Sequence, residues 1–323
     1  MYALAQNGYA NTFYSAAFRS MGLSLHNFMF VSFDPGGLIT VDKPPLSIWL
    51  QAASAGIFGF HPLALLLPEA LAGVACVGAL YWAVRAPFGR RAALAAALAL
   101  AGFPAFVAVS RDNVPDPLLI LLMTLACGVG LRAIENGRTR TLLASAGLVA
   151  LAFNTKTLAA VLVVPPLALA YALCAPGSLM RRIGQLLAAA AVLAALSLAW
   201  LSFVDLTPAA ERPYVGGSLD NSEIDLTFDY NGLGRVDGQE GTAGRIPYRP
   251  GASLLTAQGP NGGTPTAIYP ALSHGEVTAI KSEAGPPGPL RLLDRDLGGQ
   301  DGWLLPLSLL SLLTLGAGAL AAL

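Results

Sequence analysis

The sequence is poor in charged residues for its length. Only 12% of its 323 residues are Asp, Glu, Lys or Arg, whereas 54% are hydrophobic. An ordinary soluble domain carries roughly 25% charged residues, so this composition predicts a polytopic membrane protein. Lys and Arg together number 19, as do Asp and Glu, which leaves no basic excess to neutralise nucleic-acid phosphates. We therefore expect membrane lipid as a partner and no nucleic acid.

Residues that commonly bind metals or form disulfides are also scarce. The sequence has three cysteines and three histidines: Cys76, Cys127 and Cys174, and His26, His61 and His274. The cysteines lie in apolar runs without a CxxC pair, which is typical of small buried side chains. The histidines show no HxxxH or HExxH spacing, so we predict no zinc site. No phosphate-binding loop of the GxGxxG or GxxxxGK[ST] type is present.

Both ends of the sequence lack features expected of a complete membrane protein. Residues 1–18 contain neither a basic stretch nor an apolar core, so no cleavable signal peptide is predicted. Residues 303–323 form an apolar segment that has no charged tail. This pattern predicts that the chain is a fragment of a longer protein.

Long apolar runs predict seven helical spans, because a helix needs about 20 mostly apolar residues to cross a membrane. The candidate spans are residues 64–84, 92–109, 117–134, 141–153, 157–174, 183–204 and 303–322. Three arginine clusters stand between them: Arg85, Arg90 and Arg91; Arg132, Arg138 and Arg140; Arg181 and Arg182. Cytoplasmic loops are enriched in Lys and Arg. If all three clusters lie inside, residues 141–174 have to cross twice, with Asn154-Thr155-Lys156 at the turn.

This topology predicts an all-α protein with four regions. Residues 1–60 form a first extracytoplasmic loop with juxtamembrane helices, and residues 61–204 form six spans. Residues 205–302 form a second extracytoplasmic loop, and residues 303–323 a last span at which the chain is truncated. The second loop is rich in Gly, Pro, Asn and Asp, which favours an irregular lid over a packed domain. Most of the unusual polar residues then share the extracytoplasmic side.

An acid and a base stand side by side before an apolar run, in ITVDKPPLSIWL (39–50). Pro44 and Pro45 suit the first turn of a helix, where a missing N–H costs nothing. Lys43 is either an interfacial side chain that extends to the headgroups or a ligand for a lipid-linked phosphate. Asp42 either caps the helix or takes part in the chemistry.

A second polar group stands at a predicted helix entrance in SRDNVPDPLLILL (110–122). Asp116 before Pro117 is typical of a helix N-cap. Together with Arg111, Asp112 and Asn113, it forms a cluster that could hold a sugar, a phosphate or a metal.

Lys156 is the most isolated charge, in LVALAFNTKTLAAVLVV (148–164). Ionisable residues at membrane depth are costly and tend to face a cavity or a partner. The alternative is that Lys156 only marks a tight turn at the interface.

Five segments together resemble one family. They are NGYANTFYSAAFRSM (7–21), SFDPGGLITVDKPPLSIWLQAASAGIFGF (32–60), SRDNVPDPLLILL (110–122), LAFNTKT (151–157) and RPYVGGSLDNS with DYNGLGR (212–222 and 229–235). They are similar to the family-39-type, ArnT/PMT-like bacterial membrane glycosyltransferases, in the YkcB-type branch of mannosyltransferases. The resemblance covers nearly the whole chain. It implies a GT-C-type helical bundle with extracytoplasmic loops, as a multi-pass protein of the bacterial cell membrane.

The resemblance also implies a reaction. A mannose-like hexose or an aminosugar passes from a polyprenyl-phosphate donor to an extracytoplasmic glycan, lipid or protein acceptor of the cell envelope, as in lipopolysaccharide or glycolipid biosynthesis. Asp42-Lys43 matches the family's Glu-Lys-Pro-Pro, whose lysine is associated with the donor phosphate, and Asp116 matches an Asp at the start of a later span. Where the family has an acid before the first amphipathic helix, this chain has Ala10-Asn11.

Because Asn11 cannot accept a proton near neutral pH, another external carboxylate has to act as the base. We rank Asp34 first, since flexible glycines follow it in FDPGG and it shares a loop with Lys43. Asp42 comes second, because the adjacent lysine makes it a better orienter than base. The residues expected to bind substrate are Lys43, Arg111, Asp112, Asn113, Asp116 and Lys156.

Two other functions stay open at this point. A transporter or flippase of lipid-linked sugars is one, although transporters commonly show internal repeats and none is visible here. An inactive fragment of a transferase is the other, given the two abrupt ends. The sequence leaves open which sugar and acceptor are used and whether a divalent cation takes part.

Overall fold

A computed structural model describes residues 3–218 and 220–232 of the chain. In this part the chain is helical apart from two isolated β-bridges, Ser32 with Thr40 and Ile39 with Tyr214. The described residues belong to one compact unit that extends to Gly232. The predicted span 303–322 and most of the predicted loop 205–302 lie outside the described residues.

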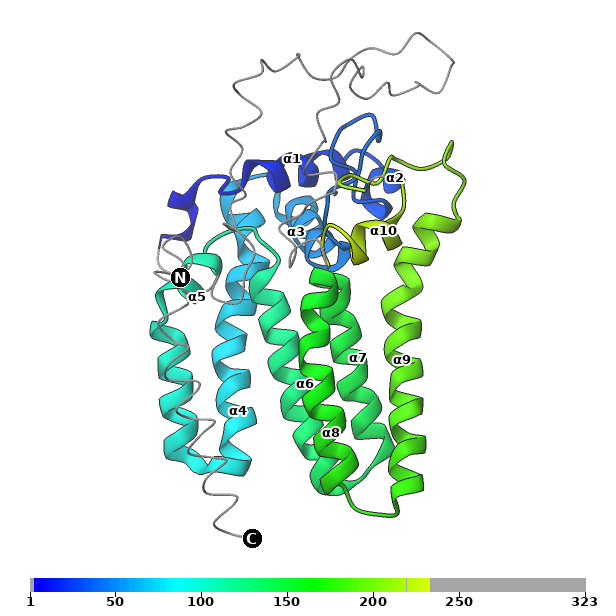
Figure 1. The fold of residues 1–323 in the computed structure, drawn as a ribbon. Coiled ribbons are helices and arrows are strands. Elements are labelled where there is room, and N and C mark those ends of the chain that lie inside the picture. The colour runs from blue at the N-terminus through cyan, green and yellow to red at the C-terminus, as the bar shows by residue number, and fades with distance from the viewer. Residues whose placement is uncertain (1–2, 219, 233–323) are drawn as a thin grey trace, which may run out of the picture. The chain divides into compact units, whose positions relative to one another are not determined.

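Four helical segments of this part are long and apolar enough to cross a membrane. They are α4 (Pro62–Gly102), α6 (Asp116–Asn136), the stretch Thr139–Cys174 and α9 (Leu179–Leu206). These segments stand side by side in Figure 1, with shorter helices gathered at one end. The helical, polytopic fold class predicted from the sequence is therefore confirmed.

α4 reverses direction at Gly89. This glycine has φ 79° and ψ 173°, outside the helical region, and such a backbone is easiest for glycine. Both ends of α4 lie near η1 (Leu4–Asn7), because Leu66 packs against Leu4, and Arg111 beyond the other end bonds to Asn7. The second arm is shorter than the predicted span, because the chain leaves the helix after Gly102 and begins α5 (Pro104–Val109).

The stretch Thr139–Cys174 also reverses direction. It consists of α7 (Thr139–Lys156), the 3-10 helix η2 (Thr157–Val163) and α8 (Val164–Cys174). Leu142 near the start of α7 and Tyr171 near the end of α8 belong to one buried cluster, so the two helices run antiparallel. The chain turns at Thr157, whose φ of 44° is left-handed. If the arginine clusters before and after this stretch lie on the same side of the membrane, the stretch crosses it an even number of times. Such a turn is then required.

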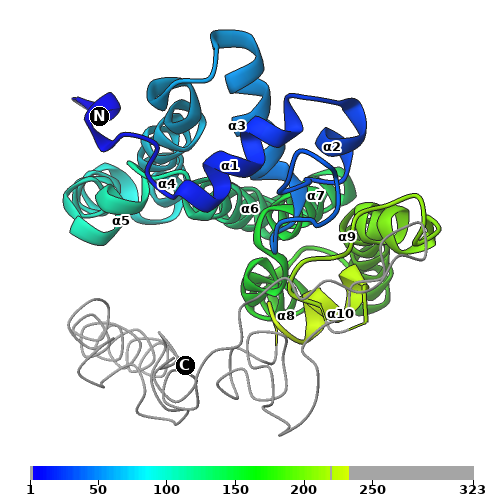
Figure 2. The same cartoon turned by 90° about the horizontal axis from the view of Figure 1, so that it is seen from above.

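The connections between the long segments gather at two ends of this unit (Figure 1). One end holds the turns at Gly89, Gly137 and Gly177, and the three arginine clusters lie beside these turns. The other end, which we call the loop end, consists of residues 3–61, 110–115 and 207–232. Its short helices are η1, α1 (Thr12–Met21), α2 (Leu25–Met29), α3 (Pro45–Phe58) and α10 (Glu223–Phe228). Figure 2 looks down on this layer.

Apolar packing fixes the layer of short helices on the long ones. Phe18 of α1, Ile48 of α3 and Leu226 of α10 are buried in the same core cluster as Leu65 of α4 and Leu201 of α9. Burial of such side chains contributes about 1.5–3 kcal/mol each. The loop end is therefore packed as part of the bundle, and polar groups within it have defined partners.

Candidate active site

A buried ion pair stands at the start of α3, on the loop end. The Lys43 Nζ lies 2.5 Å from Asp42 Oδ2, 3.2 Å from the Asp42 backbone oxygen and 2.9 Å from Asn231 Oδ1. Only 7% of the Lys43 side chain is exposed, against 22% of the Asp42 side chain. The N-cap of α3 is Pro44, without a side-chain bond, so Asp42 does not cap this helix. Protein groups therefore hold the ammonium, which does not extend into solvent.

Tyr230 and Asn231 complete the surroundings of Lys43, and sequence reasoning missed both. The Asn231 Nδ2 donates to the Asp42 backbone oxygen over 2.8 Å while its Oδ1 accepts from Lys43. The Tyr230 ring centre lies 5.4 Å from the Lys43 Nζ, within the range of a cation–π contact. In the sequence, both residues stood out only as part of the DYNGLGR segment. Their contact with Lys43 was not visible, because Asn231 lies 188 residues away from Lys43 along the chain.

Residues 213–217, which precede α10 and the turn with Tyr230 and Asn231, are fixed to the Asp42 loop by backbone hydrogen bonds. The Tyr214 N–H donates to the Leu38 oxygen over 2.8 Å, and the Thr40 N–H donates to the Tyr214 oxygen over 2.9 Å. Gly216 N–H then donates to the Thr40 Oγ1 over 2.9 Å. A Cβ at Gly216 would lie 2.3 Å from the Thr40 oxygen, so only glycine permits this approach.

Glu223 in α10 is a buried carboxyl group near the ion pair, and it too was missed. Its exposed fraction is 2%, and its Oε1 has no hydrogen-bond partner among the described residues. Burial raises the pKa of Glu223 well above its ordinary value; the charge of Asp205 adds to this, Arg212 opposes it, and Asp42 adds to it. Burial thus favours the neutral form of Glu223, whereas Asp42 is the acid that contacts Lys43 directly.

Asp34 organises the loop that precedes the ion pair. Its Oδ2 accepts bonds from the backbone N–H groups of Leu38 and Ile39, over 2.8 Å and 2.9 Å, and its Oδ1 accepts from that of Gly36 over 2.9 Å. Three bonds to one carboxylate shape this turn. The predicted role of Asp34 as base stays a prediction.

The cluster at residues 111–113 ties two loops together. The buried Asn113 side chain accepts from the Asn11 N–H over 2.9 Å and donates to the Asn11 backbone oxygen over 3.0 Å. Asp112 Oδ1 accepts from the Asn113 N–H over 2.7 Å, and Arg111 Nη2 donates to Asn7 Oδ1 over 3.1 Å. These bonds hold the loop after α5 against the start of α1.

Asp116 and Lys156 form a second ion pair at the loop end, with Lys156 Nζ 2.6 Å from Asp116 Oδ1. Their side chains are 30% and 34% exposed. The expectation that Asp116 caps its helix is wrong, because Pro115 is the N-cap and Asp116 is the first residue of α6. The carboxylate binds the lysine instead, so the isolated charge of the sequence has a partner from a neighbouring helix.

Glu69 joins α3, which begins two residues after Lys43, to α6, which begins at Asp116, and sequence analysis did not predict this role. It is 1% exposed and accepts from the Ser47 Oγ over 2.5 Å and from the Leu118 N–H over 3.0 Å. Ser47 lies four residues after Lys43 on α3, and Leu118 lies two residues after Asp116 on α6. One carboxyl group thus connects α3, α4 and α6 near the loop end.

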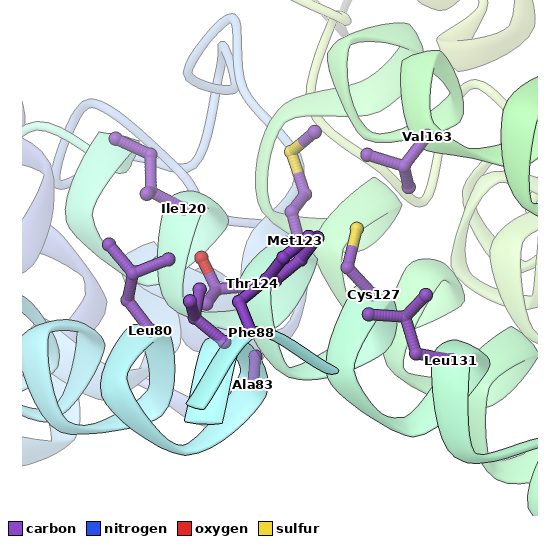
Figure 3. Close-up of a pocket in the computed structure, with 10 residues that line it drawn as sticks. Leu80, Ala83, Phe88, Ile120, Met123, Thr124, Cys127, Leu131 and Val163 are labelled. Atoms are coloured by element: carbon purple, nitrogen blue, oxygen red, sulfur yellow. The ribbon is translucent and has the colours of Figure 1, made fainter. Parts of the chain in front are cut away.

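The described part of the chain holds no metal cluster, and one of its hollows is apolar. Within residues 3–218 and 220–232 no group of three His, Cys, Asp or Glu side chains is placed to hold a metal ion. A hollow of about 390 Å³ lies between α4 and α6 and has uncharged walls (Figure 3). Its lining residues are Leu80, Ala83, Val84, Phe88, Ile120, Met123, Thr124, Cys127, Leu131 and Val163.

Comparison with known proteins identifies relatives of this chain. Residues 42–200 match the family described as dolichyl-phosphate-mannose-protein mannosyltransferase, and the match begins at Asp42. "Putative mannosyltransferase YycA" of Bacillus subtilis is 38% identical over 97% of this chain and 52% of its own length. "Putative mannosyltransferase YkcB" of the same organism is 42% identical over 76% of this chain and 34% of its own length. The chain thus spans about half of YycA and a third of YkcB.

The fold has a relative among solved structures. The apo crystal structure of ArnT from Cupriavidus metallidurans matches 62% of this chain and 37% of its own, with a TM-score of 0.52 at 24% identity. This likeness concerns the fold, which is of the GT-C type. The chain is therefore similar to ArnT/PMT-like proteins, through the family match over residues 42–200, the identity with YycA and YkcB, and the helical fold that it shares with ArnT.

Proposed function

We propose that this chain is part of a membrane glycosyltransferase that moves a mannose-like hexose or an aminosugar from a polyprenyl-phosphate donor to an acceptor of the cell envelope. The observation that supports it best is the buried Lys43 beside the carboxylate of Asp42, at one end of an apolar helical bundle. The names of the matching family and of two relatives support sugar transfer. The lipid donor is inferred from the family resemblance.

In this proposal Lys43 binds the phosphate of the donor. A lipid-linked sugar phosphate lies just above the hydrocarbon core, where the loop end meets the ends of the apolar helices. An ammonium at this level stabilises the negative charge that develops on the phosphate as it leaves. Lys43 suits this role because its ammonium is a compact positive charge with three N–H donors, in a site that is shielded from solvent.

Asp42 is the proposed base. The acceptor hydroxyl oxygen forms a bond to C1 of the sugar, and the bond from C1 to the phosphate oxygen breaks. Its electron pair leaves with the polyprenyl phosphate, and the hydroxyl proton passes to the Asp42 carboxylate. We keep Asp34 as a second candidate, but its three backbone bonds favour a role in shaping the loop.

The remaining predicted residues divide into two proposed roles. Asp116 and Lys156 are partly exposed at the loop end and suit contacts to the sugar or the acceptor. Arg111, Asp112 and Asn113 suit a supporting role, because their side chains already bond to the segment around Asn11. We propose no metal or other cofactor among the described residues.

We propose that the loop end faces the extracytoplasmic side of a bacterial cell membrane. Support comes from the arginine clusters, which stand beside the turns of the opposite end, and cytoplasmic turns are enriched in arginine. A donor whose sugar is presented outside the cell would then meet the Asp42–Lys43 pair directly.

A sugar-transfer assay tests the proposed function. Membranes that contain the chain are supplied with a labelled polyprenyl-phosphate hexose and with envelope acceptors, and the label in the acceptor is measured. We expect transfer that Asp42→Asn abolishes. Movement of the labelled lipid across the bilayer without transfer would favour a flippase, and neither activity would favour an inactive fragment.

A further inference from the structure

The ammonium of Lys43 has no N–H group to spare in the structure. It carries three donors, and three acceptor oxygens lie within 3.2 Å of the Nζ: Asp42 Oδ2, the Asp42 backbone oxygen and Asn231 Oδ1. The side chain is also almost completely buried. A donor phosphate can therefore reach Lys43 only by replacing one of these partners.

Charge decides which partner leaves. The Asp42 carboxylate and a phosphate are both anions, and two anions on one buried ammonium repel each other. The Asn231 amide is neutral and does not repel a phosphate. Its Nδ2 is bonded to the Asp42 backbone oxygen, not to the carboxylate, so this bond persists when the carboxylate turns away.

The backbone around Asn231 keeps the amide in place independently of Lys43. The Asn231 N–H donates to the Leu226 oxygen of α10 over 2.9 Å, and the Gly232 N–H donates to the Asp229 oxygen over 3.1 Å. A Cβ at Gly232 would lie 2.4 Å from the Phe228 oxygen, so the turn depends on an Asn-Gly sequence. The amide is thus presented from a tight turn that α10 supports.

We propose that Asn231 is a positioning residue of the donor site, whose amide holds the Lys43 ammonium while the donor phosphate replaces the Asp42 carboxylate. This inference rests on the proposed function. It assigns a role to the segment after α10, which lies beyond the matched residues 42–200. It also makes arrival of the phosphate the event that frees Asp42 to accept a proton.

Two variants separate the parts of this role. Asn231→Ala removes both bonds of the amide. Asn231→Asp keeps an acceptor for Lys43 and the shape of the side chain, but it loses the donor to the Asp42 backbone and adds an anion that competes with phosphate. Asn136→Ala is the matched control, because Asn136 is an exposed asparagine at the opposite end, where it ends α6 and its side chain accepts from the Arg138 N–H.

The first measurement needs no catalysis. Binding of a polyprenyl monophosphate without sugar is measured for each protein in detergent, with the thermal unfolding midpoint recorded alongside. We expect both Asn231 variants to weaken binding by about ten- to a hundredfold, the value of a hydrogen bond to a charged group, while Asn136→Ala binds as the wild type does. Equal binding by the wild type and Asn231→Asp would overturn the proposal, as would a wild type that does not bind this lipid.

The second measurement uses transfer kinetics. We expect Asn231→Ala to raise the KM for the lipid donor much more than it lowers kcat, because the carboxylate of Asp42 is untouched. A fall in kcat with an unchanged donor KM would overturn the positioning role. If the wild type binds the lipid with the predicted dependence on Asn231 but transfers no sugar, the proposed function fails and the role of Asn231 in phosphate binding stands.

Discussion

The Asp42–Lys43 pair places a carboxylate beside the lysine that we propose as the phosphate ligand, so that one side chain neutralises the other until the proposed substrate arrives. Buried charges are costly unless they are paired, and this pair has a partner in Asn231 as well. The arrangement gives the Lys43 ammonium a carboxylate and an amide as partners in a site shielded from solvent. In the proposed reaction, Asp42 therefore opposes donor binding and promotes the chemical step.

Asp42→Asn separates these two effects. A neutral amide competes less with phosphate for the ammonium, so we expect polyprenyl monophosphate to bind at least as tightly as it does to the wild type. Turnover should fall by about 10²- to 10⁴-fold, the usual contribution of a general base. Binding is measured in detergent and turnover in membranes. Weaker binding together with normal turnover would contradict the assignment of Asp42 as base.

Glu223 predicts a pH dependence of stability. Burial, with Asp205 and Asp42 adding to it, raises the pKa of Glu223 above its value in the unfolded chain, so folding favours the protonated form. The stabilisation is complete below the unfolded pKa and is lost as the pH rises toward the folded pKa. Glu223→Gln has no carboxyl group at this position and does not lose this stabilisation. The unfolding midpoint of the variant minus that of the wild type should therefore increase from pH 5 to pH 8.

The comparison for this variant is Glu135→Gln, a change of an exposed glutamate at the opposite end. We expect it to follow the pH dependence of the wild type. If Glu223→Gln and the wild type lose stability in parallel over this range, Glu223 is already ionised in the folded protein and the account of its burial is wrong.

The sequence predicted Asp42 and Lys43 as a pair but not what surrounds them. Two opposite charges before a double proline are visible in any reading of residues 39–50. Asn231 and Glu223 could not be found in this way, because their relation to Asp42 arises only when α10 folds against the loop. The ranking of Asp34 above Asp42 as base was made without the three backbone bonds that Asp34 accepts, because these bonds depend on the turn it forms.

The sequence predicted the positions of the helices more accurately than it predicted contacts between individual side chains. Apolar length and arginine position predicted the passages of α4 to α9, including the reversal at Thr157. Bounds were less accurate: the second arm of α4 ends after Gly102, because Pro104 starts a separate helix. The predicted N-cap at Asp116 was wrong, and of the two alternatives for Asp42 the cap does not occur, since each carboxylate binds a lysine instead.

Gly216→Ala tests the docking of the 213–217 segment on the Asp42 loop. The new Cβ would lie 2.3 Å from the Thr40 oxygen, so either the backbone pairing shifts or the segment separates. We expect a loss of about 1–3 kcal/mol in stability, typical of overpacking, and weaker binding of polyprenyl monophosphate. Gly147→Ala in α7 is the control, because a Cβ there meets no atom within 4 Å. Equal unfolding midpoints for the two variants would contradict the close approach at Gly216.

In the described part of the chain, the candidate residues lie at the loop end, and the arginine clusters lie beside the turns of the opposite end. This arrangement predicts that the two ends lie on opposite sides of the bilayer. Single cysteines at Glu211, exposed at the loop end, and at Arg138, exposed at the other end, report on it. Cys76, Cys127 and Cys174 are first replaced by alanine, because all three are free thiols.

An impermeant thiol reagent added outside intact cells should label Glu211→Cys and leave Arg138→Cys unlabelled until the membrane is opened. Charge near the membrane governs this orientation, since arginine-rich turns remain in the cytoplasm. Labelling of both positions from outside would contradict the proposed topology and, with it, the extracytoplasmic position of the Asp42–Lys43 pair.

The central claim is that Lys43 binds the phosphate of a lipid-linked sugar donor, and donor dependence tests it most directly. Sugar transfer is measured over a range of polyprenyl-phosphate hexose concentrations for the wild type and Lys43→Ala, with the amount of each protein measured in the same membranes. We predict that the variant needs about ten- to a hundredfold more donor for half-maximal rate, at an unchanged protein level. An unchanged donor dependence in Lys43→Ala would contradict the account.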